Sequence, residues 1–123
     1  MPSKAAALHL WLKGFGIDVY RDAAVPKDAE MPYITYSLSL GMFGEGECPA
    51  TVDVWYRTPS EAVPNAKAEE IGRALGLGGT VLRCEGGAMW VKRGEPFCQA
   101  VADEDNAVKR RTINLSIEYL TSF

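Results

Sequence analysis

A chain of 123 residues has the usual size of one domain, and it can bury one hydrophobic core but not two. Hydrophobic residues make up 47% of the sequence and charged residues 24%, a composition that excludes an intrinsically disordered chain. The net charge is −3 and the pI is about 5.1. These values argue against tight, sequence-independent binding of duplex DNA, because domains that bind in this way carry a basic patch.

The three cysteines, Cys48, Cys84 and Cys98, are odd in number and show no CxxC spacing. This pattern predicts free thiols in a reducing compartment rather than a disulfide framework. No apolar stretch approaches the roughly 18 residues of a membrane span, and the N-terminus lacks the long apolar segment of a signal peptide. We therefore expect a cytoplasmic protein.

The first element expected is a helix over residues 3–15. Ser3 has the side chain of an N-cap, and an alanine run of high helix propensity follows it. Leu8, Leu12 and Phe15 recur at helical spacing and form one apolar face. A helix this short is marginal by itself, so it must pack on the rest of the domain.

Strands are expected next at residues 17–20, 33–40 and 50–58. The second and third alternate apolar with polar side chains, which is typical of half-buried strands. Residues 41–49 connect these two strands through a glycine-rich loop, which favours their antiparallel pairing.

A second helix is expected from about residue 64 to Leu75. The preceding Thr58-Pro59-Ser60-Glu61 has the spacing of a capping box, and Pro64 delays the regular helix. Gly76 follows the last apolar residue and has the place of a C-cap glycine.

The last third of the chain is expected to form strands alone. Residues 80–93 predict a hairpin around Gly86-Gly87, and residues 97–101 a short strand. A solvated acidic loop at residues 102–108 leads to the most regular strand in the sequence, residues 111–120.

This order contains no long crossover that would demand a parallel sheet. It predicts a single α+β domain over residues 1–123. We expect an antiparallel sheet of about five to six strands, with the two helices packed on one face.

Residues that carry chemistry are sparse. His9 is the single histidine, which leaves no second imidazole for a metal site and no nucleophile motif beside it. Gly41, Gly44 and Gly46 lack the Gly-Lys-Ser/Thr ending of a phosphate loop. We therefore expect no enzyme: no catalytic residue, no cofactor and no bound metal.

Two segments instead predict contacts with partners. Large apolar side chains at the tip of the glycine-rich loop would be exposed in a free monomer, and such groups often mark an interface. The acidic loop and the basic residues after it are the second segment. The candidate residues are Met42, Phe43, Glu45 and Glu47 in the first segment, and Asp103, Glu104, Lys109, Arg110 and Arg111 in the second.

Simpler interpretations stand beside these. The first loop can be a plain hairpin connection, and the second can be a solvated loop followed by a charged strand edge. The outer strand faces, rich in hydroxyl groups and bearing Trp55, suit either docking or simple exposure to solvent.

The layout as a whole resembles a known family. The segments that carry the likeness are the helix end Leu12-Lys13-Gly14-Phe15-Gly16, the strand Val19-Tyr20, the strand entry Met31-Pro32-Tyr33-Ile34-Thr35-Tyr36, the strand Thr51-Val52-Asp53-Val54-Trp55-Tyr56, the helix end Ile71-Gly72-Arg73-Ala74-Leu75, and the closing strand from Arg111 to Tyr119. With these segments the chain resembles, over nearly its whole length, the tail terminator proteins of tailed bacteriophages and prophages. These are also called tail completion or minor tail proteins.

The resemblance implies a homo-oligomeric, hexameric ring that caps the finished tail tube and offers a surface for head–tail joining. Its partners would be the tail tube protein and the head-connector protein. DNA would pass through the ring without specific binding, and no membrane would be involved. The protein would assemble in the host cytoplasm and end in the virion, at the tail end or neck.

The residues themselves leave two alternative functions open. The first is a head–tail connector or adaptor, or a tube-like protein, of the same machinery. The second is a small ligand-binding module or enzyme with a pocket around Cys48 or His9.

Overall fold

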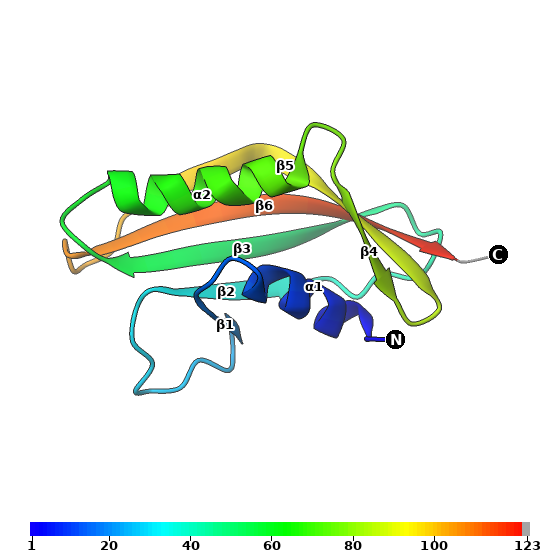
Figure 1. Cartoon of the computed structure of the whole chain (residues 1–123), viewed down its shortest axis with the longest axis horizontal. Helices are drawn as coiled ribbons and strands as arrows, with labels where there is room; N and C mark the ends of the chain where they lie inside the picture. Colours follow the sequence, from blue (N-terminus) through cyan, green and yellow to red (C-terminus); the bar gives the residue numbers. More distant parts are fainter. Residues whose placement is uncertain (122–123) are drawn as a thin grey trace.

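The computed structural model describes residues 1–121, which contain two helices and six strands (Figure 1). In chain order they are α1 (Lys4–Lys13), β1 (Asp18–Arg21), β2 (Tyr33–Leu38), β3 (Glu47–Arg57), α2 (Ala62–Leu75), β4 (Thr80–Cys84), β5 (Gly87–Val101) and β6 (Val108–Thr121). This composition confirms the predicted α+β class.

The six strands form one sheet in the order β1-β2-β3-β6-β5-β4. Neighbouring strands pair antiparallel, except that β1 runs parallel to β2, with Val19 opposite Ile34. The predicted number of strands is therefore correct, and the pairing of β1 is the exception to the predicted antiparallel sheet. The segment between β1 and β2 is long enough to carry the chain back to the end at which β1 begins.

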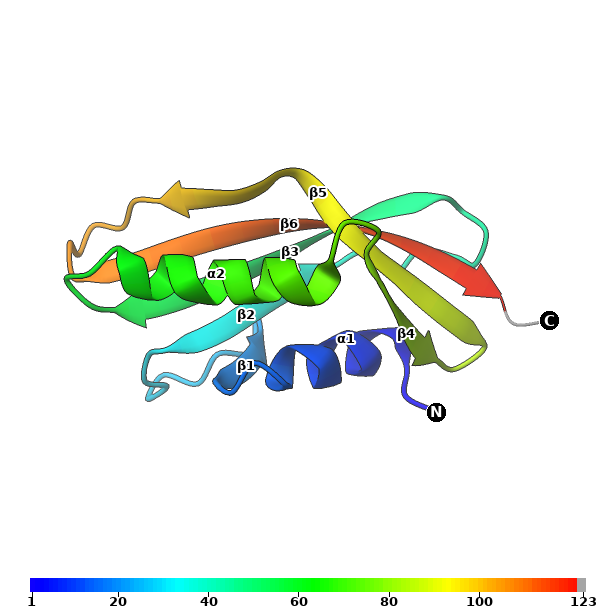
Figure 2. The same cartoon turned by 45° about the horizontal axis from the view of Figure 1, so that its top comes forward.

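Both helices cover the same face of this sheet, as predicted (Figures 1 and 2). α2 contacts β3, β6 and β5, whereas α1 contacts β1 and β4, the two edge strands. In a flat sheet these edges would lie about 24 Å apart, five spacings of roughly 4.8 Å. The sheet therefore curls around its helical layer, and α1 bridges its two edges.

The core lies between the helices and the inner face of the sheet. Alternate residues of β6 point into it because successive side chains of a strand face opposite ways. The side chains that fill it include Leu8 and Leu12 from α1, Ile71 and Leu75 from α2, and Ile113, Leu115, Ile117 and Tyr119 from β6.

The start of α1 is as predicted, since the Ser3 hydroxyl accepts a hydrogen bond from the Ala6 N–H at 3.2 Å. The start of α2 is not. The helix begins at Ala62, four residues after Thr58, and Glu61 makes no side-chain cap, so the predicted capping box over residues 58–61 is wrong. Pro64 lies in the first turn, where a backbone N–H has no partner within the helix, and it therefore does not delay the helix.

β5 joins two elements that the sequence predicts separately. Residues 87–101 form one strand, with an irregularity in its pairing to β6 between Arg93 and Cys98. β3 begins at Glu47, so the glycine-rich loop ends earlier than predicted and Cys48 is buried opposite Ile117. Within residues 1–121, neither helix has the length and apolar character needed to cross a membrane.

Candidate assembly surfaces

The predicted contact residues lie at opposite ends of the long axis of the molecule. The loop between β2 and β3 is at one end, and the loop between β5 and β6 is at the other (Figure 1). The structure thus keeps Met42, Phe43, Glu45 and Glu47 together, and separates them from Asp103, Glu104, Lys109, Arg110 and Arg111.

At the first end, Met42 and Phe43 have different surroundings. Met42 is 75% exposed, as predicted, but Phe43 packs against the core, with the Lys4 ammonium 4.3 Å from its ring centroid. The prediction that both side chains are exposed is therefore wrong for Phe43. The loop folds over the end of the inner face, where the Gly44 N–H donates to the Tyr119 carbonyl at 3.0 Å.

The two carboxylates of this end make contacts within the chain. Glu45 accepts a hydrogen bond from the Met42 N–H at 2.6 Å. Glu47 is the first residue of β3 and forms an ion pair with Lys92 of β5. The hydrogen bond from Lys92 lowers the pKa of the Glu47 carboxyl below its ordinary value. Glu45 therefore shapes the loop, and Glu47 links two strands.

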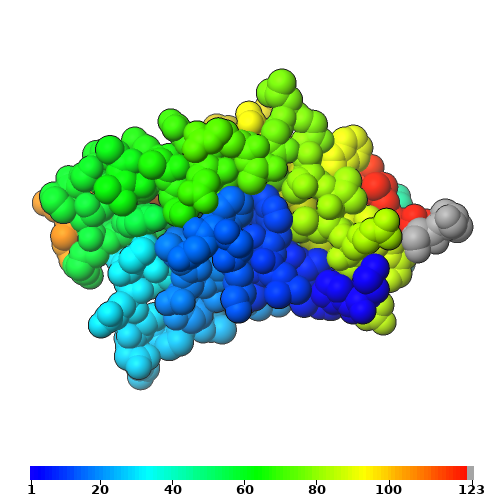
Figure 3. Space-filling model, in the orientation of Figure 1, coloured from blue at the N-terminus to red at the C-terminus, as the bar shows by residue number. Residues whose placement is uncertain are grey.

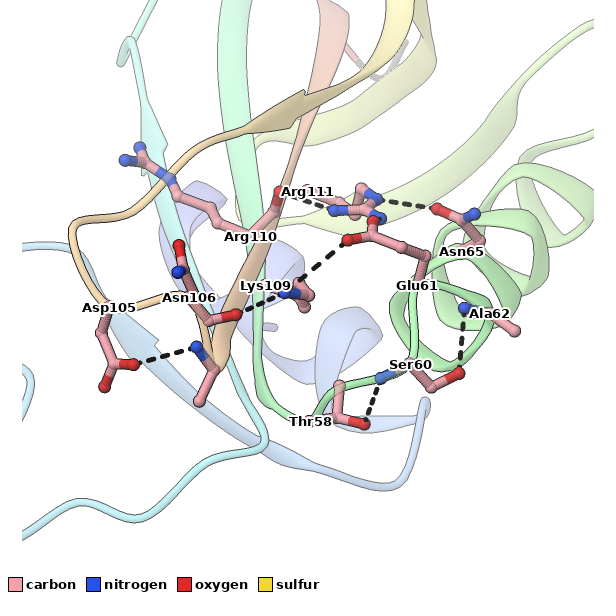
Figure 4. Close-up of polar contacts among 11 residues, drawn as sticks. Thr58, Ser60, Glu61, Ala62, Asn65, Asp105, Asn106, Lys109, Arg110 and Arg111 are labelled. Atoms are coloured by element: carbon pink, nitrogen blue, oxygen red, sulfur yellow. Dashed lines mark hydrogen bonds and ion pairs between the residues drawn. The ribbon is translucent and has the colours of Figure 1, made fainter.

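At the other end, Arg111 is buried on the helix side of the sheet, with 5% exposure (Figure 4). Its guanidinium binds the carboxylate of Glu61 and donates to the side-chain oxygen of Asn65 at 2.7 Å. Lys109 approaches the same Glu61 carboxylate at 3.7 Å. These contacts attach the start of β6 to the start of α2, and they explain why Glu61 does not complete a capping box.

Arg110 points to the opposite face, away from Arg111 (Figure 4). Its Nε donates to Asp53 at 3.0 Å, and its guanidinium lies 4.6 Å from the ring centroid of Trp55. The Trp55 indole N–H donates to the hydroxyl of Thr35 at 2.9 Å. The basic run is thus divided between the two faces of the sheet and does not form one cationic patch.

The acidic loop is ordered by local hydrogen bonds. Asp105 forms an ion pair with Arg57 at 2.8 Å and accepts from the Ala107 N–H at 2.9 Å. The hydrogen bond from Arg57, followed by that from Ala107, lowers the pKa of the Asp105 carboxyl. Asp103 accepts the Asp105 N–H at 3.0 Å, and Glu104 is exposed to solvent.

The residues considered for chemistry are engaged inside the domain. His9 Nδ1 lies 3.0 Å from the Tyr36 hydroxyl, and the buried Cys48 thiol contacts the Gly46 carbonyl at 3.8 Å. A depression of about 340 Å³ lies beside Cys48 and is lined also by Asn114. Burial raises the pKa of the Cys84 and Cys98 thiols, which disfavours their thiolates. Among residues 1–121, no group of His, Cys, Asp or Glu is arranged to hold a metal ion.

Exposed apolar residues also lie outside the predicted contact segments. Leu77, in the loop between α2 and β4, is 98% exposed. Leu10 of α1 and Val81 of β4 are 60% and 58% exposed, and both line a groove between these two elements. In the sequence, the position of Leu77 between Gly76 and Gly78 was the signal that could have identified it.

No family model and no curated protein sequence matches this chain. Among solved structures, a chain from the structure described as "Virion of native gene transfer agent (GTA) particle" is similar, with a TM-score of 0.66 at 19% sequence identity. The similarity covers 94% of this chain and 92% of that chain. The two chains therefore share one fold over nearly their full lengths.

Proposed function

We propose that this chain is a structural protein of a phage-like virion. The observation that carries the proposal is its fold, which it shares over 94% of its length with a chain of a gene transfer agent virion. The layout of its sequence, which resembles tail terminator proteins, points independently to the same class of particle. The proposed role requires surfaces for assembly and requires no catalytic group.

Within such a particle, the chain caps the tail tube as a homo-oligomeric ring, six subunits in the resembled family, and provides the surface for head–tail joining. The mechanism is steric. Binding to the last ring of the tube covers the edge that further tube subunits need, so the tube stops growing. The net charge of −3 suits the wall of a DNA passage, because like charges repel and DNA is not retained.

The long axis of the molecule supports a role between two partners. One end presents Met42 and Leu40, which are exposed apolar side chains suited to a packed contact. The other end presents the acidic loop with Glu104, suited to a polar contact. We assign the tube protein and the head-connector protein to these two ends as partners, with assembly in the host cytoplasm.

The same shared fold also supports a head–tail adaptor or a tube-like protein, because the similar chain belongs to a whole virion. The enzyme or ligand-binding alternative has less support. His9 and Cys48, the residues on which it depends, contact Tyr36 and Gly46 inside the domain.

The test is the solution mass of the purified chain, measured by light scattering over a wide range of concentrations, with negative-stain imaging of the largest species. We expect a closed ring of about six subunits, as cyclic symmetry requires for a cap that stops growing. Open tubes would instead support the alternative that the chain is a tube-like protein. A strict monomer at every concentration would contradict a ring that forms without the tail.

A further inference from the structure

A single leucine projects from the surface on a short loop between α2 and β4. Leu77 is 98% exposed, more than any other large hydrophobic residue in residues 1–121. The segment that carries it, residues 76–79, stands out from the top of the molecule (Figures 1 and 3). A side chain held this far from its own domain gains no burial there, so it is available to a partner.

The loop that carries Leu77 is fixed at both ends. The Gly76 N–H donates to the Gly72 carbonyl at 3.1 Å, which ends α2, and the Trp90 indole N–H donates to the Gly78 carbonyl at 2.7 Å. Such a preorganised side chain loses little conformational entropy when it binds. The glycines beside it have no side chains, so a partner surface can approach the backbone closely.

A groove that fits an apolar side chain lies on another part of the same chain. It runs between α1 and β4 and has a volume of about 350 Å³. Leu10 and Trp11 line it from α1 and Val81 and Leu82 from β4, and Arg83 is the one charged residue of the lining. Leu10 and Val81 are both more than half exposed, so the groove is an incomplete apolar surface. The loop of Leu77 carries no charge, and burying it in the groove would therefore desolvate no charge on the loop.

We propose that Leu77 of one copy inserts into the groove between α1 and β4 of a second copy. The inference rests on the ring of the proposed function and names its subunit contact. A cyclic ring of more than two subunits pairs two different patches of each subunit, and Leu77 and the groove are such a pair, so in the ring the contact is head to tail. Such contacts form closed rings when the rotation between subunits closes. A second copy is the occupant because both complementary parts belong to this chain.

Cross-linking tests the contact directly. Leu77→Cys and Leu10→Cys would be made as separate chains, each in a Cys98→Ser background, since Cys48 and Cys84 are buried. Mild oxidation of a mixture of the two should give a disulfide-linked pair, because insertion of Leu77 beside Leu10 brings the two residues toward the Cα separation of about 4.4–6.8 Å that a disulfide needs. Leu77→Cys mixed with Val63→Cys, an exposed site on α2, should give none. A linked pair formed only by Leu77→Cys with itself would overturn the head-to-tail contact.

The second measurement separates this inference from the proposed function. Leu77→Ser should weaken self-association in light scattering at least about tenfold, whereas the matched exposed change Val63→Ser should not. Circular dichroism should be unchanged in both, because Leu77 is almost fully exposed. A ring that persists in Leu77→Ser, without cross-linking in the mixture, would overturn this contact and leave the ring intact. A strict monomer without cross-linking would overturn both.

Discussion

The three basic residues at the start of β6 have different surroundings because successive side chains of a strand point to opposite faces. Arg111 faces α2 and is buried beside Glu61 and Asn65, while Arg110 faces outward over Trp55. Hydrogen bonds to charged groups are worth more than neutral ones. Arg111 therefore joins a helix to a strand through hydrogen bonds of this stronger kind, and we expect the stability of the domain to depend on them.

We predict that Arg111→Met lowers the free energy of unfolding by about 1–3 kcal/mol, since two charged hydrogen bonds are lost while their partners stay hydrated. Urea denaturation measures the change. Arg73→Met is the matched control, because Arg73 and its partner Glu69 are exposed and such pairs contribute little. Equal effects of the two substitutions would show that the buried contact adds nothing.

Tyr119 is a buried phenol whose hydroxyl donates to the Ser39 carbonyl at 2.6 Å. Burial raises the pKa of Tyr119 to about 12. Below pH 10 the phenol is neutral in the folded and the unfolded chain, so it adds no pH dependence. Between pH 10 and pH 12 the unfolded chain loses the proton first, and stability falls.

We predict that the wild-type chain loses roughly 2 to 3 kcal/mol of unfolding free energy through Tyr119 between pH 10 and pH 12. Tyr119→Phe should be less stable by about 1 kcal/mol at pH 8, because a hydrogen bond is lost, but its stability should fall less steeply above pH 10. Urea denaturation at a series of pH values gives both curves. Parallel curves would contradict the prediction.

At the scale of elements, the loop between β2 and β3 is a packed part of the fold. Phe43 lies under the Lys4 ammonium, and the Lys4 side chain also donates to the Gly41 carbonyl. The loop is thereby tied to the first turn of α1. Met42, one residue away, points to solvent. The sequence predicted one role for these neighbours, whereas the structure gives them two.

We predict that Phe43→Ser lowers the free energy of unfolding by about 1–3 kcal/mol, in proportion to its partial burial, and that Met42→Ser changes it by less than about 0.5 kcal/mol. Thermal and urea unfolding of the two variants checks this. If Met42 belongs to an assembly surface, Met42→Ser should reduce the binding of partners with the fold intact. A similar loss of stability in both variants would count against the separation of roles.

In the whole molecule, α1 connects the two edges of the curled sheet. It contacts β1 and β4, which are at opposite edges of the sheet and far apart in the sequence. The Glu85 N–H also donates to the Pro2 carbonyl at 2.7 Å, so the segment before α1 is joined to the β4–β5 turn. Removing α1 would uncover both edges at once, and the domain should therefore unfold as one unit.

We predict a single cooperative unfolding transition, with coincident midpoints for tryptophan fluorescence and for far-ultraviolet circular dichroism. Trp11 reports on α1, and Trp55 and Trp90 report on β3 and β5. A chemical denaturation curve followed by both signals is sufficient. Two separate transitions, or midpoints that differ between the two signals, would show that α1 detaches separately.

Most of the secondary structure could be predicted from the sequence, because its signals are local. The alternation in β6 and the helical spacing in α2 depend only on neighbouring residues and on which face is buried. The placement of both helices on one face follows from the same patterns. The ends of the elements are less predictable from local signals. The start of α2, for example, depends on Glu61, whose carboxylate binds Arg111 of β6, a strand distant in the sequence.

The α+β class, the approximate number of strands and the two segments that hold the candidate contact residues therefore follow from the sequence. Three features depend on the tertiary structure: β1 pairs parallel with β2, Phe43 packs against the core while Met42 is exposed, and Leu77 is almost fully exposed. The physical reason is the range of the interactions. Helix and strand propensities act over a few residues, whereas burial, ion pairing and exposure depend on residues brought together from distant parts of the chain.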